Sequence, residues 1–226
     1  MDKVLFWDFD GTLSYPNKSF STALYWVLCK NGYSIDENAA TKFLTNVYSW
    51  KTPEITYPNR TSELWWAMLF EKIRDFLLAH RVSPLDTTII CEDFRRKLID
   101  ISNYTLYDDT VQTLDSCIKK GYKNYLITNN YPEILDNLKK LNIDHFFSGH
   151  IVSSHIGYEK PRKEFFDYAK KISGSPRIGY VIGDNPIADI QGGKDAGFAT
   201  IAVHECKQSN ADYYFENLKQ ILSVLI

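Results

Sequence analysis

The feature that most constrains the fold is a set of short, continuously apolar runs that alternate with helical patterns. Runs of this length and composition are typical of strands buried on both faces of a sheet. They lie at Val4–Trp7, Tyr125–Ile127, Ile151–Val152, Ile178–Ile182 and Ala199–Val203. Strands that alternate with helices pair in parallel through right-handed crossovers. The pattern therefore predicts an α/β fold with a Rossmann-like open parallel sheet, closed by a last helix from about Tyr214 to Val224.

The alternation is interrupted after the first strand by a stretch that contains only helical patterns. Asp36 is placed to cap one of its helices, and an apolar stripe from Leu64 to Leu77 marks a longer one. An all-helical insert at this position predicts a second unit attached to the sheet. We expect a core domain formed by residues 1–15 and 105–226, with an inserted all-helical cap domain at 16–104.

The charge balance and the cysteines exclude several classes of protein. The 226 residues include 26 Lys and Arg against 28 Asp and Glu, for a formal net charge of −2, which does not favour nucleic acid or an anionic membrane as a partner. No run approaches the roughly 18 apolar residues of a membrane helix, and no secretory signal is recognisable. The four cysteines are far apart and form no Cys-x-x-Cys pair. We expect reduced thiols in a cytoplasmic protein.

The first candidate site follows the first apolar run, in the segment Asp8-Phe9-Asp10-Gly11-Thr12. Two carboxylates two residues apart at a strand end project to the same side. In an open α/β sheet, ligands bind beyond the carboxyl ends of the strands. Two such close negative charges resist joint ionisation unless a cation or a proton intervenes. A strand-end turn rich in Asp and Gly is the ordinary structural alternative.

Two further segments carry groups suited to an anion. Thr128 and Asn129 follow the run that ends at Ile127, and they offer a hydroxyl and backbone N–H groups just before a helix. Lys160 precedes Pro161 at the start of another predicted helix and could hold a phosphate oxygen. Taken singly, helix capping and a solvated lysine explain these residues equally well.

The last candidate segment is Gly183-Asp184-Asn185-Pro186-Ile187-Ala188-Asp189, after the run that ends at Ile182. Carboxylate oxygens such as those of Asp184 and Asp189 are the ligands that Mg²⁺ prefers. An acidic residue near a helix start also has a simple dipole explanation. However, the ends of parallel strands converge in space, so all of these segments are expected to share one pocket.

The order of the four segments resembles that of the haloacid dehalogenase superfamily of phosphatases and phosphotransferases, over residues 1–13 and about 105–205. The insert resembles the helical cap of subfamily I, and Tyr57–Trp66 is similar to the REG-2-like branch. The resemblance implies that Asp8 is the nucleophile and forms an aspartyl-phosphate. It further implies that Asp10 is the general acid and then the base, with its backbone carbonyl as a metal ligand.

The same resemblance implies roles for the other candidates. Thr128 and Asn129 would bind the phosphoryl group, and Lys160 would neutralise its charge. Asp184 would join Asp8 and Asp10 around Mg²⁺, and Asp189 would order Lys160 or a metal-bound water from the second coordination shell.

These roles predict a Mg²⁺-dependent phosphatase that hydrolyses a small phosphate monoester of metabolism. Dehalogenases of the superfamily lack an acid at the position of Asp10, so phosphoryl chemistry is favoured. A phosphomutase of the same superfamily and a non-enzymatic phosphate-responsive module are the alternatives. Among the insert's tryptophans, Trp26, Trp65 and Trp66 are expected in the core, and Trp50 is the better candidate for substrate contact.

Overall fold

The computed structural model describes residues 3–207 and 209–225, so the predicted core boundaries at residues 1 and 226 lie outside the described residues. Within these ranges there is one sheet of six parallel strands in the order β3-β2-β1-β4-β5-β6. This order is the one typical of Rossmann-like folds, and it confirms the predicted fold class. The strands are β1 (Lys3–Trp7), β2 (Tyr122–Thr128), β3 (Phe147–Val152), β4 (Ile178–Gly183), β5 (Ala199–Val203) and β6 (Tyr213–Phe215).

Helices cover both faces of the sheet, because successive strand side chains point in opposite directions. On β1, Val4 and Phe6 join a buried cluster with Phe165, whereas Leu5 and Trp7 join the larger core on the other face. The helices outside the insert are α5 (Thr110–Lys119), α6 (Ile134–Lys140), α7 (Ser153–Ile156), α8 (Lys163–Ile172) and α9 (Gly192–Asp195), with a π-helix at Pro186–Gln191 and 3₁₀ helices at Ile101–Asn103, Asp144–Phe146 and Leu218–Ser223.

The register of the central strands brings their carboxyl ends level. Trp7 at the end of β1 lies opposite Leu126 of β2 and Ile182 of β4. The residues that follow these three positions therefore emerge at one edge of the sheet. The strand order reverses around β1, which is where open α/β sheets place their ligand sites.

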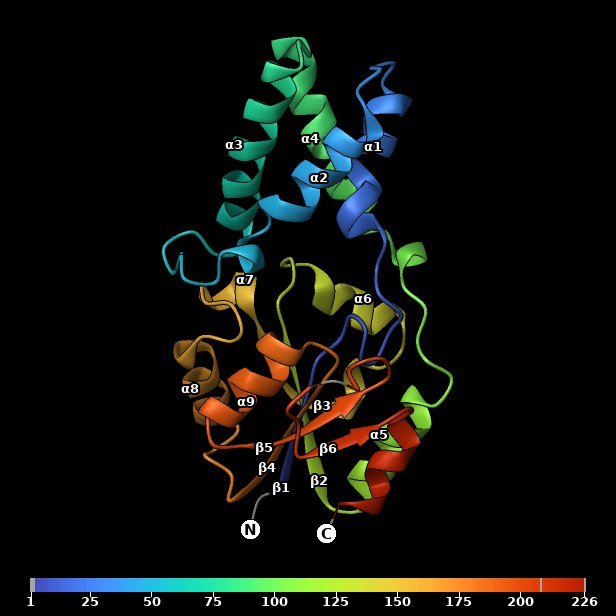
Figure 1. Ribbon diagram of the computed structural model, residues 1–226, viewed down its shortest axis with the longest axis vertical. Helices are drawn as coiled ribbons and strands as arrows, with labels where there is room; N and C mark the ends of the chain where they lie inside the picture. The colour runs from blue at the N-terminus through green and yellow to red at the C-terminus, as the bar shows by residue number, and fades with distance from the viewer. Residues whose placement is uncertain (1–2, 208, 226) are drawn as a thin grey trace.

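The insert is helical, as predicted, and it lies above the carboxyl ends of the strands (Figure 1). Its two connections run side by side, since the Tyr15 N–H donates to the Thr105 carbonyl at 2.9 Å. The domain boundaries at 15/16 and 104/105 stay a prediction. The helices of this cap are α1 (Ser19–Lys30), α2 (Glu37–Val47), α3 (Glu63–Ala79) and α4 (Pro84–Leu98), with a 3₁₀ turn at Ser49–Lys51.

Local sequence signals explain where the cap helices begin. The Asp36 carboxylate accepts the Ala39 N–H at 2.8 Å and caps α2 as predicted. Helix α4 begins at Pro84, because Ser83 caps it by accepting the Leu85 N–H at 3.3 Å and proline suits the first helical position. No helix in residues 3–207 and 209–225 is long and apolar enough to cross a membrane.

Two expectations were wrong. The predicted helix from Tyr214 to Val224 is instead strand β6 followed by the 3₁₀ helix Leu218–Ser223, because the Tyr-Tyr-Phe segment pairs with the edge of β5. Trp26 is 49% exposed. It lies on the outer side of α1, with the ammonium groups of Lys30 and Lys97 at 5.6 and 5.0 Å from its ring.

The loop between α2 and α3 docks on the core through its backbone. The Tyr57 N–H donates to the Gly157 carbonyl at 2.9 Å, and the Ser62 N–H donates to the Ser154 carbonyl at 2.8 Å. Gly157 has a φ of +80°, and a Cβ at this position would lie 2.5 Å from the Pro58 nitrogen. The close approach of cap and core therefore requires glycine here.

Replacing Gly157 with alanine is expected to lower the free energy of unfolding by about 2–5 kcal/mol, the sum of left-handed strain and a backbone clash. Gly121→Ala is the matched control, because Gly121 has a φ of +83° but no atom of the described residues lies within 4 Å of the added Cβ. The free energy of unfolding of this control is expected to fall by only about 1–2 kcal/mol. Chemical denaturation measures both, and equal losses would show that cap docking does not depend on Gly157.

Candidate active site

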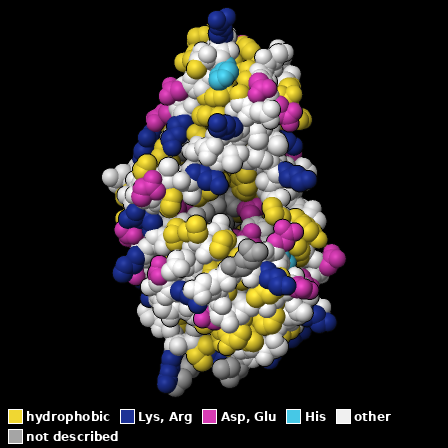
Figure 2. Space-filling view, in the orientation of Figure 1, with side chains coloured by type: hydrophobic (Ala, Val, Ile, Leu, Met, Phe, Trp, Pro, Cys, Tyr) yellow, Lys and Arg dark blue, Asp and Glu magenta, His cyan; other side chains and the backbone are white. Residues whose placement is uncertain are grey.

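A cavity of about 220 Å³ lies between the cap and the carboxyl ends of the central strands. Figure 2 shows the molecule hollowed between these two parts. A larger groove of about 1150 Å³ borders it at Asp184, but Asp8 and Lys160 line only the smaller cavity. All the candidate residues from the sequence line this smaller cavity, namely Asp8, Asp10, Thr128, Asn129, Lys160, Asp184 and Asp189.

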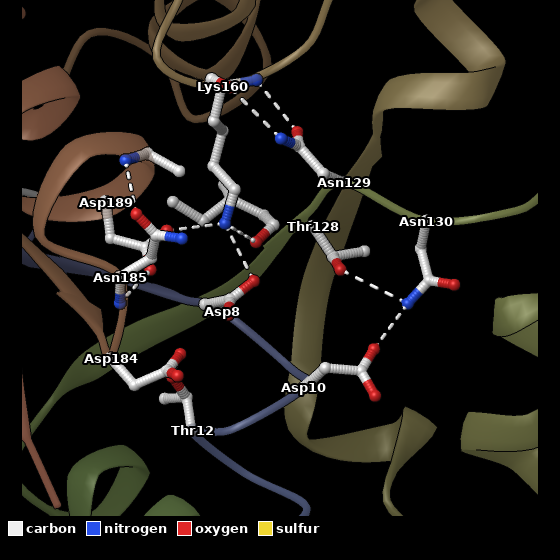
Figure 3. Close-up of polar contacts among 12 residues, drawn as sticks. Asp8, Asp10, Thr12, Thr128, Asn129, Asn130, Lys160, Asp184, Asn185 and Asp189 are labelled. Atoms are coloured by element: carbon white, nitrogen blue, oxygen red, sulfur yellow. Dashed lines mark hydrogen bonds and ion pairs between the residues drawn. The ribbon is translucent and has the colours of Figure 1, made fainter. Parts of the chain in front are cut away.

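The Lys160 ammonium lies between two buried carboxylates (Figure 3). Its Nζ donates to Asp8 Oδ1 at 2.7 Å, to Asp189 Oδ1 at 2.5 Å and to the Ile127 carbonyl at 3.1 Å. Burial alone lowers the pKa of Lys160, but Asp189 and Asp8 together raise it above its usual value. Burial raises the pKa of Asp8, and the charge of Lys160 opposes that shift. Lys160 therefore stays charged and favours the ionised form of Asp8.

Asp8, Asp184 and Asp189 form an acidic cluster whose ligand oxygens lie within 4.8 Å of one another. Burial raises the pKa of Asp184 to about 6, with a further contribution from the charge of Asp189. Thr12 Oγ1 donates to Asp184 Oδ1 at 3.2 Å. Hard oxygen donors that repel one another fit a small divalent cation such as Mg²⁺.

Asp10 belongs to a different part of the site although it is only two residues from Asp8. Its carboxylate turns toward Asn130 and away from Asp184 (Figure 3), and its Oδ2 accepts Asn130 Nδ2 at 2.7 Å. Its Oδ1 is buried and has no hydrogen-bond partner among the described residues. Burial, followed by the charge of Asp8, raises the pKa of Asp10 well above its usual value. The surroundings therefore favour protonated Asp10.

Asn129 holds the backbone of Lys160 in place. Its Oδ1 accepts the Lys160 N–H at 2.8 Å, and its Nδ2 donates to the Lys160 carbonyl at 3.0 Å. Both polar atoms of the Asn129 side chain are thus engaged, which leaves its backbone N–H for the predicted phosphate contact. Thr128 is buried beside it, at the end of β2.

Asn130 and Thr12 are functional-site residues that the sequence patterns did not single out. Asn130 lies in the predicted anion-binding segment, but capping explained it equally well, and its contact with Asp10 spans 120 positions in the chain. Thr12 lies next to the Asp-x-Asp-Gly turn, so its position in the first motif was the available signal. The cap adds Phe20, Trp50 and Lys51 to the cavity wall.

A family model described as a haloacid dehalogenase-like hydrolase matches residues 3–197, which is most of the chain. The chain belongs to this family. Its membership of the REG-2-like branch stays a prediction.

The similar proteins within and around this family include a phosphatase and a dehalogenase. Glyceraldehyde 3-phosphate phosphatase from Methanopyrus kandleri is 30% identical over 108 residues, 47% of this chain and 46% of that enzyme. The chain thus spans about half the length of the first curated relatives that it matches. A HAD-hydrolase from Bacillus subtilis, solved bound to magnesium, aligns with a TM-score of 0.69 at 20% identity over 99% of this chain and 98% of that one. A 2-haloacid dehalogenase from Pseudomonas syringae aligns with a TM-score of 0.70 at 20% identity, over 100% and 98% of the two chains.

Lys160→Met is expected to lower the free energy of unfolding by about 3–5 kcal/mol at pH 7.5, because two buried carboxylates lose their cation. The loss is expected to be smaller at pH 5. The pKa of Asp189 is already raised to about 6, and without Lys160 the pKa values of Asp8 and Asp189 rise further. The folded variant then binds more protons than the unfolded chain, so its stability falls as the pH rises through those values.

Denaturation in EDTA at the two pH values measures this effect. Lys163→Met is the control, because Lys163 is 81% exposed and, among the described residues, pairs with Asp167 on the same helix. It is expected to change stability by less than about 0.5 kcal/mol. A pH-independent loss for Lys160→Met would contradict the proposed charge balance.

Proposed function

We propose that the protein is a Mg²⁺-dependent phosphatase that hydrolyses a small phosphate monoester through an aspartyl-phosphate. The observation that carries the proposal is that two neighbouring carboxylates have different surroundings. Asp8 lies 2.7 Å from the Lys160 ammonium, whereas Asp10 is turned toward Asn130 and has a strongly raised pKa. An ionised nucleophile beside a protonated acid is what a two-step phosphoryl transfer needs.

In the first step, an Asp8 oxygen attacks phosphorus and the bond from phosphorus to the ester oxygen breaks. The ester oxygen takes the proton of Asp10 and leaves as an alcohol. In the second step, the Asp10 carboxylate removes a proton from water, and the resulting oxygen attacks phosphorus. The bond to Asp8 breaks, inorganic phosphate leaves, and both carboxyl groups return to their starting states.

The other residues of the site hold the phosphoryl group and cancel its charge. Lys160 neutralises the phosphoryl oxygens and is itself oriented by Asp189 and Asn129. Thr128 donates its hydroxyl, and Asn129 its backbone N–H, to these oxygens. Bound by Asp8, Asp184 and the backbone carbonyl of Asp10, Mg²⁺ would supply further positive charge to the attacked phosphate.

Asp10 also distinguishes phosphatase from dehalogenase chemistry. The fold alone does not separate them, since the chain resembles a dehalogenase structure as closely as it resembles other hydrolases. A halide leaves without a proton, whereas an alkoxide requires one, so a positioned acid favours phosphate esters. The similarity to a glyceraldehyde 3-phosphate phosphatase supports the same conclusion. A cytoplasmic location is part of this proposal.

Phosphate release from a panel of sugar phosphates, nucleotides and phosphorylated acids tests the proposal. Activity is expected with Mg²⁺ and none in EDTA, with poor recovery in Ca²⁺ because Ca²⁺ prefers more ligands at longer distances. Asp8→Asn is expected to fold normally and to lose more than about 100-fold in rate, because an amide cannot form the intermediate. Isomerised product with little free phosphate would indicate a mutase, and no turnover would favour a phosphate-responsive module.

Asp10→Asn is expected to slow formation of the aspartyl-phosphate far more for alkyl phosphates than for p-nitrophenyl phosphate. The aryl leaving group needs little protonation, whereas an alkoxide needs much. Hydrolysis of the intermediate is expected to slow equally from both substrates, because both form the same Asp8 phosphate. Single-turnover measurements separate the two steps. Equal slowing of the first step for both leaving groups would exclude Asp10 as the general acid.

A further inference from the structure

We propose that Trp50 and Lys51 of the cap form a subsite for the leaving group, which selects short phosphate monoesters that carry a second anionic group. This inference rests on the proposed phosphatase function and specifies its substrate class. It follows from how the 3₁₀ turn Ser49–Lys51 is held, what it presents to the cavity, and how small that cavity is.

The turn is fixed to the residue that precedes Lys160. Ser49 Oγ donates to Glu159 Oε1 at 2.5 Å, and the Tyr57 hydroxyl donates to the same oxygen. Trp65 Nε1 in turn donates to Ser49 Oγ at 3.1 Å. Glu159 is fully buried, so these bonds are shielded from water. The cap turn and the catalytic lysine are therefore held in a defined relative position.

Trp50 forms a rigid apolar wall of the cavity. Its ring stacks on Tyr48 with centroids 4.2 Å apart and planes 8° apart. Phe20 packs edge-on at 5.4 Å, and Trp65 lies nearly parallel at 6.3 Å. A ring held by three others presents a fixed surface, which suits contact with the carbon atoms of a bound molecule.

Lys51 supplies a positive charge that the proposed chemistry does not use. Among the described residues that line the cavity, Lys160 and Lys51 are the cations, and Lys160 is bound to Asp8 and Asp189. Lys51 is exposed, and no carboxylate of the described residues lies within 4.0 Å of its ammonium group. Asp8, Asp184 and Asp189 line the same cavity and disfavour a second anion at the sheet edge. Lys51, on the cap, offers such an anion a positive charge.

The cavity also limits the length of the leaving group. Its volume of about 220 Å³ is below the roughly 300–1,000 Å³ of pockets that hold drug-sized ligands. A phosphoryl group at Asp8 would take up part of this volume, which favours a short carbon chain beside Trp50. The expected substrate is therefore a phosphorylated acid of a few carbon atoms, with its carboxylate at Lys51.

The test compares 3-phosphoglycerate with glycerol 3-phosphate, which share a carbon skeleton and differ in a terminal carboxylate or hydroxymethyl group. The wild-type enzyme is expected to favour the acid by about tenfold in kcat/KM, the lower range for a charge-assisted hydrogen bond. In Lys51→Gln the ratio is expected to fall to about one. Lys51→Arg keeps the charge and is expected to retain a preference for the acid. Lys42→Gln, an exposed lysine on α2, is the control and is expected to keep the wild-type ratio.

The outcomes separate this proposal from the proposed function. Asp8-dependent turnover of both substrates without a preference for the acid would overturn the subsite and leave the phosphatase intact. An equal fall for both substrates in Lys51→Gln would also overturn it, because Lys51 would then contact the transferred phosphoryl group. No turnover of either substrate or of p-nitrophenyl phosphate would overturn both proposals.

Discussion

The rest of the site depends on the two ion pairs that the buried Lys160 ammonium group makes with Asp8 and Asp189. Two carboxylates this close, with almost no exposure to water, would otherwise hold protons rather than charge. The lysine opposes the rise in the pKa of Asp8 that burial causes, and the backbone of the lysine is fixed in turn by Asn129. This arrangement requires four strands to end at the same edge of the sheet. The charge balance of the site therefore depends on the parallel register of the strands.

The same constraint explains why Asp8 and Asp10 differ so much. They are two residues apart, yet Asp10 turns toward Asn130, where the charge of Lys160 lowers its pKa less than burial raises it. One carboxylate is thereby suited to attack and the other to donate a proton. The distinction between acid and nucleophile arises from the surroundings and not from residue type.

The cap is coupled to this site through Glu159, the neighbour of Lys160. Ser49 and Tyr57 donate hydrogen bonds to Glu159. These bonds connect the residues at the edge of the sheet to the turn that carries Trp50 and Lys51. Close backbone packing of Pro58 on Gly157 reinforces the same contact. The part of the cap that lines the cavity is therefore held by the loop that supplies Lys160.

The sequence by itself determined the α/β class, the helical insert and the candidate residues that the strand ends bring to the cavity, because strand periodicity and strand-end motifs are local signals. It did not determine β6, since a three-residue edge strand forms only when β5 offers its edge. Nor did it reveal that Trp26 is exposed, because helical spacing shows that a face is apolar but not which face meets the core. The partnership of Asn130 with Asp10 and the attachment of the cap through Glu159 were decided by the tertiary structure, because both join residues about 100 or more positions apart.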